Sequence, residues 1–172
     1  MTTRRRIILH WTAGKLHPNT EELKHYHYLI DSDAGLHLGL YRPEDNDNCK
    51  DGHYAPHAGG GNTRSIGVAF CGMMGFVSKS NPGNQLLTRK QVEKGFHLCA
   101  LLLQQEGHDQ PTHDNLMTHY ELGLKNPLTD SKGKIDIIYL PPFEHLAPEE
   151  IGHFIRQKTA WYLNKVIRKG AL

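Results

Sequence analysis

The chain contains, near its amino terminus, the stretch Ile7-Ile8-Leu9-His10-Trp11-Thr12, which combines apolar and β-branched residues with a single histidine. A short apolar run of this composition predicts a buried β-strand. His10 falls inside the predicted strand, where a functional side chain would be held rigidly. The chain has 13 histidines. This excess favours a metal or proton-transfer site, because imidazole binds zinc and titrates near neutral pH.

Other strands are expected farther along the chain. Residues 26–30 are rich in aromatic and β-branched side chains, and residues 36–40 have an apolar period of two. The Asp and Gly residues of segment 31–35 predict a turn between them, so the two strands form a hairpin. Residues 65–71 are a short apolar run, which predicts a central strand covered on both faces. Residues 43–56 are polar without periodicity and predict an exposed loop.

Three helices are expected as well. Thr20, followed by two glutamates, predicts the N-cap of a short helix. Thr88 and Gln91 form a capping-box pattern before an apolar stripe that ends near Gly107. A last helix is predicted over residues 148–167, with Pro148 in its first turn. Strands and helices alternate without repeats or an evident linker, so the sequence predicts one α/β domain over residues 1–172.

The composition excludes several classes of protein. No apolar stretch approaches the ~20 residues of a membrane-spanning helix. The net charge is only +2, and no basic run is interleaved with aromatic residues, so nucleic acid is not an expected partner. The three cysteines form no C-x-x-C pair, which argues against a disulfide framework. The apolar run after the basic residues 1–6 is too short for a secretion signal, so we expect synthesis in the cytoplasm without encoded export.

A catalytic zinc site needs three protein ligands and an open position for water. The residues His10, His119 and Asp136 are one candidate set. Spacing alone does not select this set, because 13 histidines and 18 acidic residues allow many triplets.

Five segments of the chain carry a pattern that does select it. They are residues 8–14 (ILHWTAG), 26–31 (YHYLID) followed by Gly35, 57–62 (HAGGGN) followed by 65–68 (SIGV), 119–121 (HYE), and Lys134 with Asp136. In this order they resemble the amidase-2 family of N-acetylmuramoyl-L-alanine amidases, which includes phage lysozyme-type amidases and animal peptidoglycan recognition proteins. The resemblance implies an α/β fold in which helices flank a central mixed β-sheet.

The resemblance also implies roles for individual residues. It implies that His10, His119 and Asp136 bind Zn²⁺, and that Tyr26 and Lys134 are the catalytic side chains. Bound zinc lowers the pKa of water toward ~7, which supplies a hydroxide to attack an amide carbonyl. The Lys134 ammonium would stabilise the oxyanion, and Tyr26 would hydrogen-bond the water or pass its proton toward the leaving nitrogen.

Two positions depart from the family pattern. Some cytosolic relatives have a glutamate base where this chain has Ala69, so the chain resembles the members that rely on tyrosine. Family members usually have proline after the third ligand, whereas this chain has Ile137. Asp130 and Asp114 therefore remain alternative third ligands.

Two residues of the glycine-rich segment are candidates for substrate binding. The resemblance places His57 near the metal without binding it, where it would contact the sugar or the lactyl-peptide junction. A structural hydrogen bond is the alternative for this histidine. Asn62 is expected to hydrogen-bond the same substrate.

The function implied is hydrolysis of the amide bond between N-acetylmuramic acid and L-alanine in peptidoglycan, in a phage-type endolysin that acts on the wall after release. Two alternatives remain: a non-catalytic peptidoglycan-binding module, and a cytosolic amidase that recycles muropeptides, against which Ala69 argues. A cysteine nucleophile has little support, because Cys71 and Cys99 lie in apolar segments. The five basic residues of segment 156–169 allow weak membrane contact, but a helix packed on the sheet is favoured.

Overall fold

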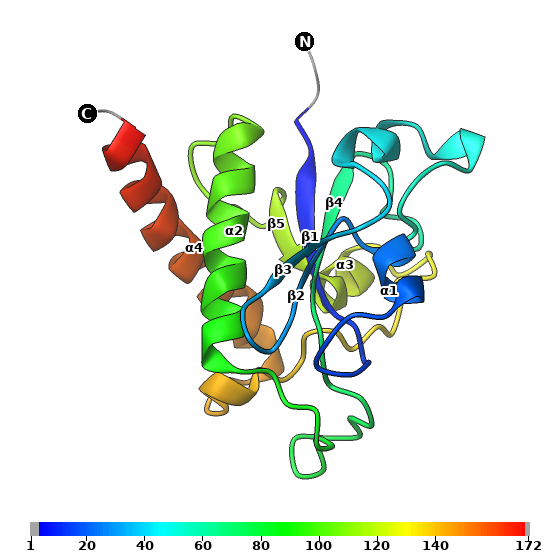
Figure 1. Cartoon of the computed structure of the whole chain (residues 1–172), viewed down its shortest axis with the longest axis vertical. Helices are drawn as coiled ribbons and strands as arrows, with labels where there is room; N and C mark the ends of the chain where they lie inside the picture. The colour runs from blue at the N-terminus through cyan, green and yellow to red at the C-terminus, as the bar shows by residue number, and fades with distance from the viewer. Residues whose placement is uncertain (1–3, 171–172) are drawn as a thin grey trace.

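In the computed structural model, which describes residues 4–170, a five-stranded sheet separates two groups of helices (Figure 1). The strands are β1 (Arg6–Trp11), β2 (Tyr28–Ile30), β3 (Leu36–Leu38), β4 (Ser65–Phe70) and β5 (Leu116–Thr118). Their order is β3-β2-β4-β1-β5. β1 pairs in parallel with β4 and β5, β2 pairs in parallel with β4, and β3 is antiparallel to β2. The mixed sheet and the hairpin are therefore confirmed.

Two long helices cover one face of this sheet and two short ones lie on the other (Figure 1). The long helices are α2 (Arg89–Gln105) and α4 (Pro148–Gly170), and the short ones are α1 (Thr20–His25) and α3 (His119–Lys125). Three 3₁₀ turns are η1 (Pro43–Asp47), η2 (Cys49–Asp51) and η3 (Pro141–Phe143). No helix in residues 4–170 has the length and apolar character needed to cross a bilayer.

The alternation of side chains along β1 decides which residues reach the functional face. Ile7, Leu9 and Trp11 belong to the large apolar core under α2 and α4. Ile8 points to the opposite face, where it packs with Leu122 of α3. Because successive strand residues point to opposite faces, His10 lies on the same side as Ile8. Helices α2 and α4 therefore cover one face of the sheet, and His10 lies on the opposite face, which carries the short helices α1 and α3.

The predicted helix starts hold except at α1. Its N-cap is Asn19, whose side-chain oxygen accepts the backbone N–H groups of Glu21 and Glu22, both at 2.9 Å. The expected Thr20 cap is therefore wrong by one residue, because the asparagine carboxamide reaches these N–H groups. At α2 the capping box of Thr88 and Gln91 is present as predicted.

Two other expectations need correction. The strand predicted from residue 26 begins at Tyr28, because Tyr26 ends α1 and donates its N–H to Glu22 O at 3.2 Å. The loop at residues 43–56 contains η1 and η2 and is not wholly exposed. Asn46 is buried there, with its amide donating to Ala55 O at 3.0 Å.

The basic C-terminal helix packs on the body of the protein. Arg156 of α4 pairs with Glu121, and Lys158 pairs with Glu93 of α2. Two of the five basic residues thus hold the helix in place, as expected for a covering element. Weak membrane contact by this helix stays a prediction. At the other end of the chain, residues 1–3 of the basic segment 1–6, which was considered as a secretion signal, lie outside the described residues.

Candidate metal centre

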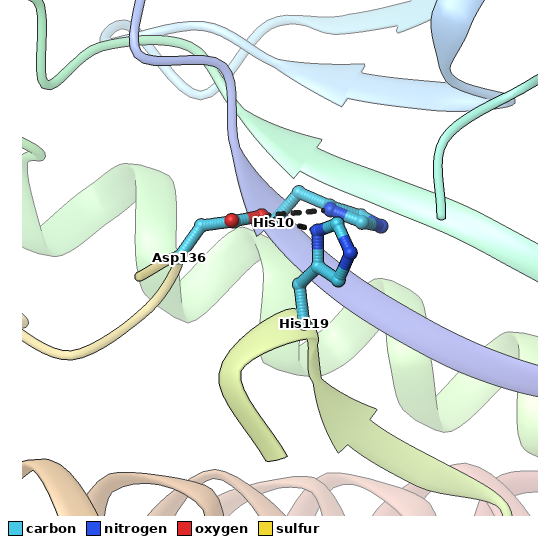
Figure 2. Close-up of side chains that lie close together, drawn as sticks. All are labelled: His10, His119 and Asp136. Atoms are coloured by element: carbon cyan, nitrogen blue, oxygen red, sulfur yellow. Dashed lines mark hydrogen bonds and ion pairs between the residues drawn. The ribbon is translucent and has the colours of Figure 1, made fainter. Parts of the chain in front are cut away.

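Three side chains that are far apart in the sequence converge at the carboxyl ends of β1 and β5 (Figure 2). His10 comes from β1, His119 is the first residue of α3, and Asp136 lies on the loop that follows α3. One potential ligand atom from each lies within 4.8 Å of the other two. Asp136 Oδ2 is 2.8 Å from His10 Nδ1 and 3.1 Å from His119 Nδ1. The three residues are only 0%, 5% and 9% exposed for His10, His119 and Asp136 respectively.

The start of α3 holds two of these residues together. Thr118 caps the helix by accepting the Glu121 N–H at 3.2 Å, and the Glu121 carboxylate accepts the Thr118 N–H at 2.9 Å. This capping box fixes His119 at the first helical position. The N–H of the next residue, Tyr120, donates to Asp136 O at 2.7 Å. The helix start therefore anchors the loop that carries Asp136, and the Asp136–Ile137 peptide bond is cis.

The hydrogen bond behind His119 determines which of its nitrogens carries the proton. Ser131 donates its only hydroxyl proton to Gly59 O at 2.6 Å. Its oxygen also lies 3.1 Å from His119 Nε2. Because the proton is already used, Ser131 Oγ must accept from His119 Nε2–H. A neutral His119 with Nε2 protonated has a free lone pair on Nδ1, which faces Asp136.

The tautomer of His10 follows from the same assignment of protons, along a series of hydrogen bonds that runs from Ser65 through His57. Ser65 donates its hydroxyl proton to Asn62 O at 2.7 Å, so it accepts from His57 Nε2–H at 3.0 Å. Burial lowers the pKa of His57 well below its usual value, so the ring is neutral and its Nδ1 is an acceptor. His10 Nε2, at 3.1 Å, therefore donates to His57 Nδ1. The Nδ1 lone pair of His10 is left facing Asp136.

The charges of the three groups fit a divalent cation. Burial lowers the pKa of His10, which keeps its imidazole neutral. Burial would raise the pKa of Asp136, but a hydrogen bond or positive charge from His10 or His119 lowers it well below its usual range, so the carboxylate is ionised whenever an imidazole donates to it. In the two tautomers described above, two imidazole lone pairs and one carboxylate oxygen converge, and a cation between them would offset their mutual repulsion. This is the donor set of three-ligand catalytic zinc sites, and histidine ligands in such sites typically donate their other N–H to a fixed acceptor.

A cleft of about 420 Å³ opens beside the cluster. Its lining includes Tyr26, His57, Phe76 and Lys134 together with two of the converging residues, His119 and Asp136. The Tyr26 ring centroid is 5.1 Å from that of His10, and burial followed by the charge of Asp136 raises the pKa of the Tyr26 hydroxyl. Lys134 is exposed at the rim. The structure therefore brings two candidate ligands and both candidate catalytic side chains to one cavity, and His10 lies directly behind it against Asp136.

The two candidate substrate contacts, His57 and Asn62, form hydrogen bonds within the protein, and their contact with a substrate stays a prediction. Both ring nitrogens of His57 are used, one by His10 and the other by Ser65, so neither is free for a substrate. Asn62 does not line the cleft, and its side-chain oxygen accepts the Ala58 N–H at 2.7 Å. The structural alternative for His57 is the one that the contacts support. Asn62 closes the turn of its own loop.

The remaining candidates lie apart from the cluster. Asp114 pairs with Lys125, and neither Asp114 nor Asp130 joins the group of converging ligand atoms within the described residues. Sequence reasoning missed Ser131 and Ser65. No local signal marks either serine, because their roles depend on backbone carbonyls and imidazoles that folding brings to them.

An α/β domain with two histidines and a carboxylate in a cleft at the end of its sheet defines a candidate metal-dependent enzyme. The chain belongs to the N-acetylmuramoyl-L-alanine amidase family, because the family model of that description matches residues 2–134. The match includes His10 and His119 and ends before Asp136. It confirms the resemblance stated from the five sequence segments.

Several solved structures are similar to the chain at low sequence identity. PlyL is 19% identical with a TM-score of 0.48, covering 90% of this chain and 83% of its own. Bumblebee PGRP-SA is 13% identical with a TM-score of 0.48, covering 77% of this chain and 78% of its own. The Ph2119 endolysin from Thermus scotoductus MAT2119 bacteriophage Ph2119 is 19% identical with a TM-score of 0.46, covering 71% and 75% respectively. A comparison with curated proteins finds no match.

Proposed function

We propose that this protein is a zinc-dependent N-acetylmuramoyl-L-alanine amidase that cleaves the bond between N-acetylmuramic acid and L-alanine in peptidoglycan, as a phage-type endolysin does. The observation that carries the proposal is the convergence of His10 Nδ1, His119 Nδ1 and Asp136 Oδ2 in a chain of this family. His10, His119 and Asp136 would hold the ion. Zinc bound there supplies Lewis-acid activation of a water nucleophile near neutral pH.

Lys134 is suited to stabilise charge on the substrate. It lines the cleft two positions before Asp136 in the sequence, and its side chain is exposed to the cavity rather than tied to an acidic partner among the described side chains. A protonated ammonium beside the scissile carbonyl would stabilise the negative charge that develops on the carbonyl oxygen. We assign Lys134 this role.

Tyr26 is suited to donate a hydrogen bond. Burial and the nearby Asp136 carboxylate raise the pKa of its hydroxyl, so it stays protonated at neutral pH. A protonated phenol cannot act as a base, but it can donate to the substrate carbonyl or toward the leaving nitrogen. The β4 position of Ala69 is buried beside Leu29 and Cys71, so this chain has no carboxylate there to take the proton instead.

The proposal is tested by metal analysis and by peptidoglycan hydrolysis with matched variants. The purified protein should contain one zinc per chain and should release new amino termini from purified peptidoglycan. Tyr26→Phe and Lys134→Ala should each lower kcat by about 100-fold or more with the zinc content unchanged. Lys132→Ala, which removes an exposed lysine from the same loop, should leave kcat unchanged.

Other results would overturn parts of the proposal. Retained binding to cell walls without zinc and without product would identify a binding module rather than an amidase. Full activity on soluble muropeptides with none on intact sacculi would identify a recycling enzyme rather than an endolysin. Unchanged turnover in both Tyr26→Phe and Lys134→Ala would show that the assigned roles are wrong.

A further inference from the structure

A second cavity, of about 230 Å³, lies at the opposite end of the sheet from the metal centre. It is lined by Arg4, Arg6, Thr63, Arg64 and Asp114. These residues stand at or before the first residues of β1, β4 and β5, which run parallel. The candidate metal centre lies at the carboxyl ends of the same strands. The two sites are therefore separated by the length of the sheet.

The cavity has an excess of positive charge, with three arginines and one aspartate in its lining. Arg4, Arg6 and Arg64 form no ion pair among the side chains that the structure describes. The one carboxylate present, on Asp114, is already paired with Lys125. Arg5, which points away from the cavity, shows the contrast, because it pairs with Glu44, Asp47 and Glu106. Three guanidinium groups thus line a space whose one carboxylate is shared with Lys125, which leaves a net positive charge.

Arg6 is the member of this group that folding holds most firmly. Its Nη2 donates to Gly61 O at 3.1 Å, while its Nε is buried without a hydrogen-bond partner. Burial lowers the pKa of its guanidinium, and no acidic neighbour offsets that effect. A buried donor on a charged group is costly when it has no acceptor. An anion in the cavity that Arg6 lines would supply the counter-charge that this guanidinium lacks.

The other two arginines are placed by the backbone around the cavity. Arg64 has a positive φ of 54° and donates its N–H to Asn46 O at 2.8 Å, while its own carbonyl accepts the Arg6 N–H at 3.2 Å. The Arg4 guanidinium lies against Gly107 at the end of α2. Thr63 adds a hydroxyl donor at the rim. Planar guanidinium groups are suited to bind the oxygens of a phosphate group, and three arginines line this cavity.

We propose that this cavity, formed by Arg4, Arg6, Thr63 and Arg64, binds a phosphate group, either as the free ion or as an ester. A tetrahedral phosphate offers several acceptor oxygens, so it can engage the three guanidinium groups at once, whereas a carboxylate offers only two oxygens. The proposal does not depend on zinc or on amidase activity.

The test is a titration of the full chain with inorganic phosphate and with glycerol 3-phosphate at constant ionic strength, followed by NMR shifts of backbone amides. The wild type should show saturable shifts at residues 61–65 with both probes. Arg64→Gln should weaken the affinity about tenfold, as expected for loss of a charge-assisted hydrogen bond. Arg168→Gln, the same change at an exposed site on α4, should leave the affinity within about twofold of the wild type. Peptidoglycan hydrolysis should be unchanged in both variants.

Three outcomes would overturn the proposal. The first is the absence of saturable shifts with both phosphate probes. The second is equal weakening by Arg64→Gln and Arg168→Gln, which would indicate diffuse attraction to net charge. The third is binding to phosphatidylglycerol vesicles without binding to either small probe, which would indicate a membrane-facing surface. Arg4→Gln serves as a second variant if Arg64→Gln is not folded, and it should also weaken phosphate binding.

Discussion

Replacing Ser131 by alanine should weaken zinc binding although Ser131 is not a ligand. The wild-type hydroxyl accepts His119 Nε2–H at 3.1 Å and donates to Gly59 O at 2.6 Å, and the side chain is fully buried. Without it, the His119 proton can move to Nδ1, where it would donate to Asp136 Oδ2 at 3.1 Å. The lone pair needed by the metal is then blocked in part of the population.

The size of the effect follows from the lost hydrogen bonds. Loss of a partner that orients a histidine ligand typically weakens metal affinity by 10–100-fold, and we expect about tenfold, or about 1.4 kcal/mol, because only one of the two imidazoles is affected. The metal-free protein should also lose about 1–3 kcal/mol of unfolding free energy, since Gly59 O loses its donor in a buried place.

The measurement is competition for zinc with a chromophoric chelator, combined with urea denaturation of the metal-free protein. Ser80→Ala, the same change at an exposed serine, is the matched control and should change neither quantity. A folded Ser131→Ala protein with wild-type zinc affinity would refute the assignment of the His119 tautomer. It would leave the identity of the three ligands to be tested separately.

Three other predictions concern stability. Burial lowers the pKa of His27 from its ordinary 6.5 to about 4, so the unfolded chain binds the proton more tightly. The free energy of unfolding, measured by urea denaturation, should therefore fall by about 3 kcal/mol as the pH drops from 6.5 through 4. In His27→Gln the free energy of unfolding should fall by less over the same pH range. Gly67→Ala would place its Cβ 2.5 Å from His57 Cγ, and we expect a loss of about 1–3 kcal/mol together with weaker zinc binding in the chelator assay. Arg156 donates to the Glu121 carboxylate at 2.9 and 3.0 Å, with side chains only 15% and 14% exposed. Arg156→Met should cost about 1–3 kcal/mol in thermal or urea unfolding, and adding Glu121→Gln should recover part of it, whereas additive losses would contradict a direct coupling.

Local sequence patterns predicted the elements whose signals are complete in themselves. β1, β4 and α2 were predicted because an apolar run or a capping box marks each of them. β5 and α3 were missed. β5 has only three residues, Leu116–Thr118, and its strand conformation depends on pairing with β1 through Ile7 and Leu116. A partner more than 100 positions away in the chain leaves no local trace.

The candidate site also has a part that the sequence predicted and a part that only the structure shows. The resemblance named His10, His119 and Asp136, and folding brings these three together. The hydrogen bonds that orient them were not predictable, because Ser131 and Gly59 are 72 positions apart in the sequence. The residues that would contact the metal follow a family pattern, whereas those that set the protonation of the imidazoles depend on the tertiary structure.

The glycine-rich segment 57–62 shows why this difference matters. His57 and Asn62 of this segment were predicted to contact a substrate, and the segment also makes hydrogen bonds and close contacts within the protein. A Cβ on Gly59 would lie 2.6 Å from Asp130 Cβ, and a Cβ on Gly61 would lie 2.6 Å from Leu122 Cδ2, so the glycines allow close packing against the segment around α3. The carbonyls of Gly59 and Asn62 accept the two serine hydroxyl protons that fix the imidazole tautomers. Since one loop receives both chains of hydrogen bonds, a displacement of its backbone would disturb His10 and His119 together. We therefore infer that this loop orients the candidate metal ligands His10 and His119.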